Sequence, residues 1–291
     1  MELPLVVGVD GSEPSLRAVD WAVDEAARHG LSLRLVYASL WERYEGAVPS
    51  DSPGSPSEQQ IAEHVVTTAA ECARRRNPDV KVSVDVLDEE AADALLSEAH
   101  HAFAVVTGSR GRGELAGLLL GSVGLTVAAR AHGPVIVVRG ATAGLAGTHD
   151  RILLGAAEPA IAGSAVRFAF REAEARGCTL DVVRAWRSPA HETTAAPASA
   201  DEPARYYKER ASALLDAVLH DAMADHPAVR ARPDAVEGPA HKVLLRRAAA
   251  ADLVMVGARR RQGHWGLQLG RVGHTLLHHA PCPVAIIPQQ V

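Results

Sequence analysis

Three closely spaced glycines follow a β-branched run in VVTGSRGRGELAGLLLGSVGLTV, residues 105–127. Gly108 and Gly111 have no side chain to hold a ligand away from the backbone, and they allow peptide N–H groups to turn toward phosphate oxygens. Gly121 and Ser122 precede an apolar segment, where the N–H groups and dipole of a helix start favour an anion. The spacing indicates either a phosphate-binding loop or a mobile connection between a strand and a helix.

A carboxylate, Asp10, follows another apolar run near the N-terminus. It could accept a hydrogen bond from an adenine amine or a ribose hydroxyl, or it could cap a helix that begins in GSEPS. The carboxyl ends of parallel strands meet at one edge of a sheet, so we expect Asp10 and Gly108 at the same crevice. The dinucleotide pattern G-x-G-x-x-G is missing after the first strand, and the chain has no Walker A Gly-Lys-Ser/Thr.

The elements that must position these residues alternate between short apolar runs and longer segments of helical periodicity. In the first half we expect strands at 5–9, 31–38, 80–87, 102–107 and 135–138, and helices at 15–29, 59–76, 89–101 and 122–131. Five strands with crossover helices predict a doubly wound parallel α/β sheet.

The pattern occurs twice. Residues 8–38 and 155–185 align without a gap, with ten identical positions out of 31, and residues 105–139 align with 254–288 with 14 out of 35. A period of nearly 150 residues indicates two similar domains rather than a solenoid. The small and polar segment 139–150 is the predicted linker, so we expect domains at 1–140 and 150–291.

The composition suits this architecture. The chain is 47% hydrophobic but only 4% aromatic, so its cores must be built from Ala, Val and Leu. A net charge of −5 gives no field that favours nucleic acid or anionic lipid. The three cysteines are far apart, and neither a signal peptide nor a membrane span is evident, so we expect a cytoplasmic protein.

The order Gly108-x-x-Gly111, nine residues, Gly121-Ser122, with Asp10 after the first strand, resembles the ATP-binding branch of the universal stress protein family. The turns AHGPVIVV and HAPCPVAIIP are similar to the family's last helix-to-strand turn, once in each half. The likeness implies a Rossmann-like fold of the adenine-nucleotide α-hydrolase type in both domains.

The resemblance also implies which residues hold the nucleotide. Adenine would contact Asp10 and the backbone around Gly8, Val9 and Ala38. The ribose and phosphates would be lined by Thr107, Gly108 and Gly111. The triphosphate would be capped by Gly121, Ser122 and Val123. Arg110 and Arg112, beside the glycines, would either add positive charge there or be solvated loop residues.

Several positions depart from the family pattern. Gly124 stands where family members often carry a hydroxyl, which removes one phosphate contact. In the second half Ala157, Arg260 and Arg271 replace Asp10, Gly111 and Ser122, whereas Gly257 and Gly270 persist. We therefore expect ATP in the N-terminal domain and a degenerate second site, where residues 259–261 and Arg271 could still trap a simple anion.

The family likeness implies a stress-response regulator that binds ATP, alone or with Mg²⁺, and acts through an unknown protein partner. The alternatives are a nucleotide-independent interaction scaffold and a weak ATPase. No nucleophile elbow or general base is evident, so we expect no catalytic residue. We expect no metal site either, because His274 and His278 lack a recognisable set of further ligands. Strands 135–138 and 284–287 would pair the two halves or support a homodimer.

Overall fold

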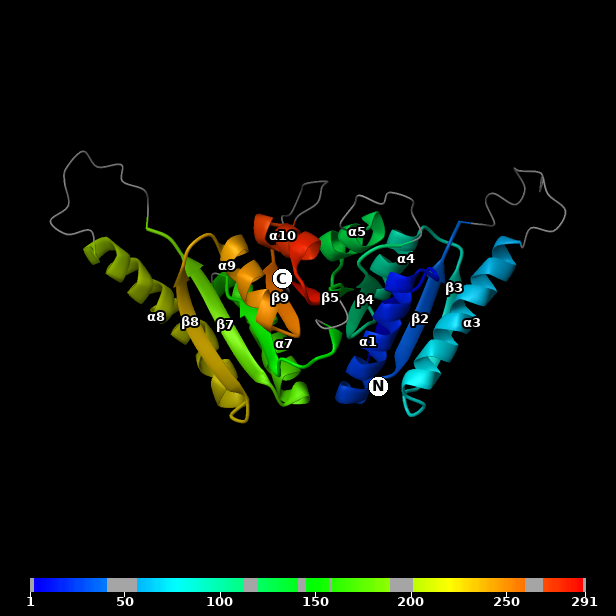
Figure 1. Cartoon of the computed structure of the whole chain (residues 1–291), viewed down its shortest axis with the longest axis horizontal. Helices are drawn as coiled ribbons and strands as arrows, with labels where there is room; N and C mark the ends of the chain where they lie inside the picture. The colour runs from blue at the N-terminus through cyan, green and yellow to red at the C-terminus, as the bar shows by residue number, and fades with distance from the viewer. Residues whose placement is uncertain are drawn as a thin grey trace. The chain divides into compact units, whose positions relative to one another are not determined.

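The computed structural model describes residues 3–40, 57–111, 120–140, 145–157, 159–188, 201–259 and 269–289. These residues fall into two compact units, of which the first contains the described residues up to Arg139 and the second those from Gly140 onward. Each unit has its own strands and its own helices (Figure 1).

The sheet of the first unit has five parallel strands in the order β3-β2-β1-β4-β5. Their bounds are β1 Leu5–Gly8, β2 Leu33–Ala38, β3 Val82–Leu87, β4 Ala104–Gly108 and β5 Val135–Val138. The strand order runs outward in both directions from β1 and β4, so the crevice between their carboxyl ends is the point where the winding reverses. Strands β1, β4 and β5 are almost completely buried, as expected for central strands covered on both faces.

In the part of this unit that the structure describes, the sheet is covered by α1 Glu13–His29, α3 Glu58–Arg76, α4 Ala91–Glu98 and α5 Ser122–Arg130. Helix α1 packs on α3, and α4 packs on α5. A Cβ atom on Gly8 would meet Leu95 of α4, whereas one on Gly108 would meet the backbone of Pro14 in α1. The two helix pairs therefore lie on opposite faces, and the predicted doubly wound α/β fold is confirmed.

The local sequence explains where α1 begins and ends. The side chain of Ser12 caps its first turn by accepting a hydrogen bond from the N–H of Ser15. The helix ends at Gly30, whose φ of 67° is a left-handed conformation that glycine adopts without a Cβ penalty. Within the predicted helix 89–101, the regular turns stop at Glu98, because the N–H groups of His100 and His101 bond three residues back and tighten the last turn.

The second unit repeats the arrangement, with strand order β8-β7-β6-β9-β10 and all neighbours parallel. Its strands are β6 Arg151–Gly155, β7 Thr179–Trp186, β8 Arg230–Glu237, β9 Leu253–Ala258 and β10 Val284–Pro288. Its helices are α7 Pro159–Arg176, α8 Asp201–Asp225, α9 Ala240–Arg247 and α10 Arg271–His279, with a 3₁₀ turn at Ala248–Ala250. Gly177 has a φ of 61° and follows α7 as Gly30 follows α1.

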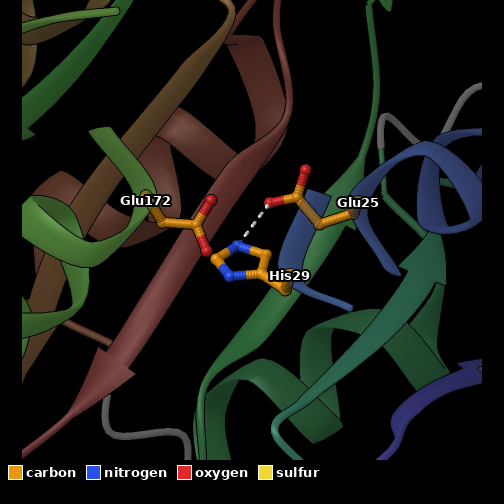
Figure 2. A group of neighbouring side chains, drawn as sticks. All are labelled: Glu25, His29 and Glu172. Atoms are coloured by element: carbon orange, nitrogen blue, oxygen red, sulfur yellow. Dashed lines mark ion pairs between the residues drawn. The ribbon is translucent and has the colours of Figure 1, made fainter. Parts of the chain in front are cut away.

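Each unit also buries one carboxylate on its first helix. Glu25 of α1 is fully buried and pairs with Arg28 at 2.9 Å. It also pairs with His29 at 3.6 Å (Figure 2). Glu172, at the same place in the repeat, is fully buried and pairs with Arg176 of α7 at 3.3 Å. A buried carboxylate needs such a cation close by, since an uncompensated charge in the interior is strongly destabilising.

Among the described helices, none is both long enough and apolar enough to cross a membrane.

Candidate functional site

A cavity of about 350 Å³ opens at the carboxyl ends of β1, β2 and β4 in the first unit. Its walls come from the strand ends, from the first turns of α4 and α5, and from the segment that follows β4. It is lined by Gly8, Val9, Asp10, Ser15, Val36, Ala38, Ala91, Leu95, Thr107, Gly108, Arg110, Gly111, Leu120, Gly121, Ser122, Val123 and Gly124. A volume of this size at a winding reversal is typical of a small-molecule site.

The end of β1 supplies both space and charge. Gly8 leaves room for Leu95 of α4, since a Cβ there would be only 2.8 Å from the Leu95 side chain. Asp10 follows, with Oδ1 accepting hydrogen bonds from the N–H of Ser12 at 3.0 Å and from its hydroxyl at 2.6 Å. One carboxylate oxygen thus holds Ser12, the residue that caps α1, so the cap itself is Ser12 and not Asp10.

The other oxygen of Asp10 points toward the glycine segment after β4. A Cβ on Gly111 would collide with Oδ2 of Asp10. The carboxylate and the backbone of Gly111 therefore lie in direct contact, although about one hundred residues separate them in the chain. A side chain at position 111 would displace the carboxylate from the cavity wall.

The start of α5 forms the opposite wall. Its N-cap, Gly121, is extended with φ −72° and ψ 153° and has no side chain to accept a hydrogen bond from the first turn. The N–H of Gly121 itself donates to the carbonyl oxygen of Ser109 at 2.9 Å. The first-turn amides of an α-helix have no partner within the helix, so the residues lining the cavity at Ser122 and Val123 present a partial positive charge there.

One side chain in the wall is polar, buried and without a partner. Thr107 is 5% exposed, and its Oγ1 makes no hydrogen bond to the part of the chain that the structure describes. The last residue of β4, Gly108, faces the other way and packs against α1.

Eleven of the twelve predicted site residues line this one cavity, and Arg112 lies outside the described residues. Sequence reasoning missed the apolar wall of Val36, Ala91 and Leu95, as well as Ser15 and Leu120. Val36 could have been found from the sequence, because it lies two residues before Ala38 on the same strand and therefore on the same face of the sheet. The α4 residues carry no chemical signal, because their role depends only on where the helix packs.

The second unit differs at the corresponding positions. Ala157 replaces Asp10, and its carbonyl oxygen accepts a hydrogen bond from Nη1 of Arg184 at 2.7 Å. Helix α10 begins at Arg271 after Gly270, again with no side-chain cap. Arg260 lies outside the described residues. The rings of His274 and His278 stack on α10 with centroids 4.5 Å apart.

Comparison with known proteins agrees with the repeat. The sequence model of the universal stress protein family matches residues 3–139 and again residues 148–288. The chain belongs to the universal stress protein family. Universal stress protein Rv1996 of Mycobacterium tuberculosis is 30% identical over 318 residues, which span 99% of this chain and 96% of the relative. A universal stress protein of Mycolicibacterium smegmatis is 28% identical over 295 residues, covering 98% and 97%.

Among solved structures, a universal stress protein from Archaeoglobus fulgidus superposes with a TM-score of 0.69 over 99% of this chain and 98% of its own. The two sequences are 16% identical, so the likeness concerns the fold. It extends over both units of this universal stress protein.

Proposed function

We propose that this universal stress protein binds ATP in the cavity of its N-terminal unit and acts in the stress response as a nucleotide-dependent regulator rather than as an enzyme. The observation that carries the proposal is the convergence of Asp10, Gly108, Gly111 and Gly121 on one cavity. These residues come from three separate parts of the chain, and the ligand they suit has both hydrogen-bonding groups and negative charge.

The two ends of the cavity suit different parts of a nucleotide. The apolar end, at Val36, Ala38 and Leu95, suits a flat base. The other end, at Gly111 and the start of α5, combines open backbone with an uncapped helix terminus and suits phosphate. Arg110 lines this end as well and adds positive charge.

Asp10 and the backbone of Gly8, Val9 and Ala38 would hold the base. The sugar and phosphates would lie along Thr107, Gly108 and Gly111, and Gly121, Ser122 and Val123 would cap the triphosphate, with or without Mg²⁺. The second unit lacks the carboxylate, so we assign it no nucleotide. Cys72, Cys178 and Cys282 form no disulfide with one another, which suits a reducing cytoplasm.

The test is calorimetric titration of the whole protein with ATP, comparing Gly121→Asp with Gly270→Asp. Both positions are N-caps with no side-chain cap, and among the described residues no atom comes closer than 3.6 Å to a new Cβ at either position. An aspartate at 121 would take up the first-turn amides and repel phosphate, so binding should be lost. Gly270→Asp should bind as the wild type does.

Mass spectrometry of small molecules that copurify with the protein provides a second test. An adenine nucleotide released from the wild type and missing from Gly121→Asp supports the proposal. Titration that shows no ATP binding by the folded wild type contradicts it and favours the nucleotide-independent scaffold.

A further inference from the structure

The outer edge of the first unit's sheet is β3, which pairs only with β2 in the part of the chain that the structure describes. The carbonyl oxygen of Lys81 accepts a hydrogen bond from the N–H of Leu33 at 2.8 Å, and that of Leu87 accepts one at 3.1 Å from the residue after β2. Successive residues of a strand direct their backbone groups to opposite edges, so the even-numbered residues of β3 direct theirs away from β2. These residues are Val82, Val84 and Val86. Their N–H and C=O groups form a template for an added strand.

The side chains along this edge are apolar and partly exposed. Val84 is 36% exposed and Val86 is 41% exposed. Their partners in the sheet, Leu35 and Tyr37 of β2, are buried. Paired residues of parallel strands point to the same face, so the two valines continue a buried apolar row out to the edge. A strand added beside β3 would extend this row and cover the valines.

The corresponding edge of the second unit is closed by a proline. Leu35 corresponds to Val182 in the repeat, and Val182 pairs with Pro233 of β8 as Leu35 pairs with Val84 of β3. The N–H of Gly238 donates to β7 at 2.9 Å, so by the same alternation Pro233 faces away from β7. A proline at this position has no N–H to offer to an added strand. Val84 has one at the same place.

The β3 edge is complementary to a second copy of itself. When two β3 strands run antiparallel about a two-fold axis at Val84, this residue lies opposite its own counterpart and Val82 lies opposite Val86. All the outward backbone groups of the strand then pair, giving about six hydrogen bonds, two for each pair of residues. A shift by two residues places one of the valines opposite a residue beyond the strand, so the register centred on Val84 uses the edge best.

The polar residues of the other face favour the same register. Ser83 would lie opposite Asp85 of the second copy, and Lys81 would lie diagonal to that carboxylate, within reach of a long side chain. Arg34 already pairs with Asp85 at 3.0 Å, which offsets the negative charge that the two copies bring together. The edge therefore offers a second copy hydrogen bonds, apolar contact and opposite charge at once.

We propose that two copies of this chain pair through β3 in an antiparallel two-fold dimer, which joins their first units in one continuous sheet. Such a contact is isologous, so the association closes at two copies. β3 has six residues, and a pair of such strands buries less than the ~1,600 Å² of a standard stable interface. The dimer is therefore weak and depends on protein concentration. This inference does not rest on the proposed nucleotide function.

The first experiment is sedimentation equilibrium of the whole protein from about 1 to 300 µM, a range that brackets a weak dimer. Val84→Pro gives β3 the residue that β8 has at the corresponding position, and proline is tolerated at an outward position of an edge strand. Lys81→Glu reverses an exposed charge beside the partner's Asp85. Arg230→Glu, at the matching exposed position before the centre of β8, is the control.

We expect the wild type to dimerise with a dissociation constant on the order of 10–100 µM. Val84→Pro should weaken the dimer at least about tenfold, because the central pair loses both of its N–H donors. Lys81→Glu should weaken it about fivefold, since the reversed charge faces a carboxylate in each half of the contact. Arg230→Glu should stay within about twofold of the wild type.

Cysteine substitutions test the register. In Val84→Cys the two introduced thiols would face each other with Cα atoms about 5.5 Å apart, a distance that a disulfide spans. In Val86→Cys they would be four residues out of register, about 13 Å or more apart. We expect mild oxidation to join Val84→Cys into covalent dimers and to leave Val86→Cys unlinked, with the wild type giving the background from its own cysteines.

A wild type that stays monomeric over the whole range overturns the inference and leaves the edge to an extended segment of another protein. A dimer that both Val84→Pro and Lys81→Glu leave unchanged also overturns it, because another surface then joins the copies. If Val84→Pro does not fold, Lys81→Glu decides, since it changes only an exposed side chain. Cross-linking of Val86→Cys in place of Val84→Cys contradicts the proposed register and the two-fold pairing with it.

Discussion

The backbone of Gly108, at the end of β4, lies directly against the backbone of Pro14 in the first turn of α1. A Cβ on Gly108 would stand 2.7 Å from both the carbonyl carbon and the carbonyl oxygen of Pro14. Neither of these atoms can swing aside as the end of a long side chain can. Glycine at position 108 is therefore needed for packing, whatever it contributes to a ligand.

Gly108→Ala should accordingly destabilise the fold. We expect the free energy of unfolding to fall by about 1–3 kcal/mol, because β4 and α1 must move apart to accept the methyl group. Urea unfolding followed by circular dichroism measures the change. A variant as stable as the wild type would show that the contact with Pro14 relaxes without cost.

Gly121→Ala should behave in the opposite way. The backbone at Gly121 is ordinary extended conformation, and the nearest atom to a new Cβ is Cα of Arg110 at 3.6 Å. We expect stability to change by less than about 0.5 kcal/mol, as at positions free of strain, while ATP affinity falls about tenfold because the methyl group occupies the cavity wall. Calorimetry and urea unfolding on the same samples separate the two effects, and Gly270→Ala is the matched control.

Substitutions of Asp10 and Ser12 should distinguish an effect on ligand binding from an effect on helix capping. Ser12→Ala removes the cap of α1 and should cost about 1 kcal/mol of stability while ATP affinity stays within about twofold. Asp10→Ala removes two hydrogen bonds to Ser12 and the carboxylate beside Gly111, so both stability and affinity should fall. Equal affinities of the two variants would mean that Asp10 serves only the helix start.

Titration should give one ATP bound per chain. The second unit has Ala157 in place of the carboxylate, and the carbonyl of Ala157 is already engaged by Arg184. The stoichiometry in calorimetry checks this expectation at protein concentrations above the dissociation constant. Two equivalent sites per chain would show that the second unit binds nucleotide without an acidic residue at this position.

Cys72 and Cys178 should be poor nucleophiles. Burial, first of all, raises the pKa of the Cys178 thiol above its usual value, and burial together with the carboxylate of Asp20 raises the pKa of Cys72. Because the thiolate is the reactive form, alkylation by iodoacetamide near pH 8 should be slower than in the same protein unfolded in urea. Mass spectrometry of tryptic peptides gives the rate at each cysteine.

The same pKa shifts predict how the free energy of unfolding changes with pH. Folding favours the neutral thiols, so the unfolded state releases these protons at a lower pH than the folded state does. The stability that the neutral thiols contribute should be fully present below the unfolded pKa and should be lost as the pH rises from there through the higher folded pKa. Urea unfolding of the wild type and of Cys178→Ala between pH 8 and 10 isolates this contribution, and parallel pH profiles would contradict it.

Local patterns along the chain were sufficient to predict the element order, the fold and the repeat. The periodicity of apolar residues that distinguishes strands from helices is visible within each short segment of the sequence. They also placed Asp10 and the glycines at strand ends, since a parallel sheet brings those ends to one edge. The exact ends of elements depended on hydrogen bonds that the pattern does not carry, as at His100 and His101 after α4.

Tertiary packing alone decided which neighbours complete the cavity and how its polar groups are used. Leu95 lines the cavity because α4 packs over Gly8. The residue type alone does not distinguish this leucine from one in the core. The division of the Asp10 carboxylate between Ser12 and Gly111 depends on a distance between segments far apart in the chain. Such distances are set by how the helices pack on the sheet, so they cannot be predicted from the spacing of residues in the sequence.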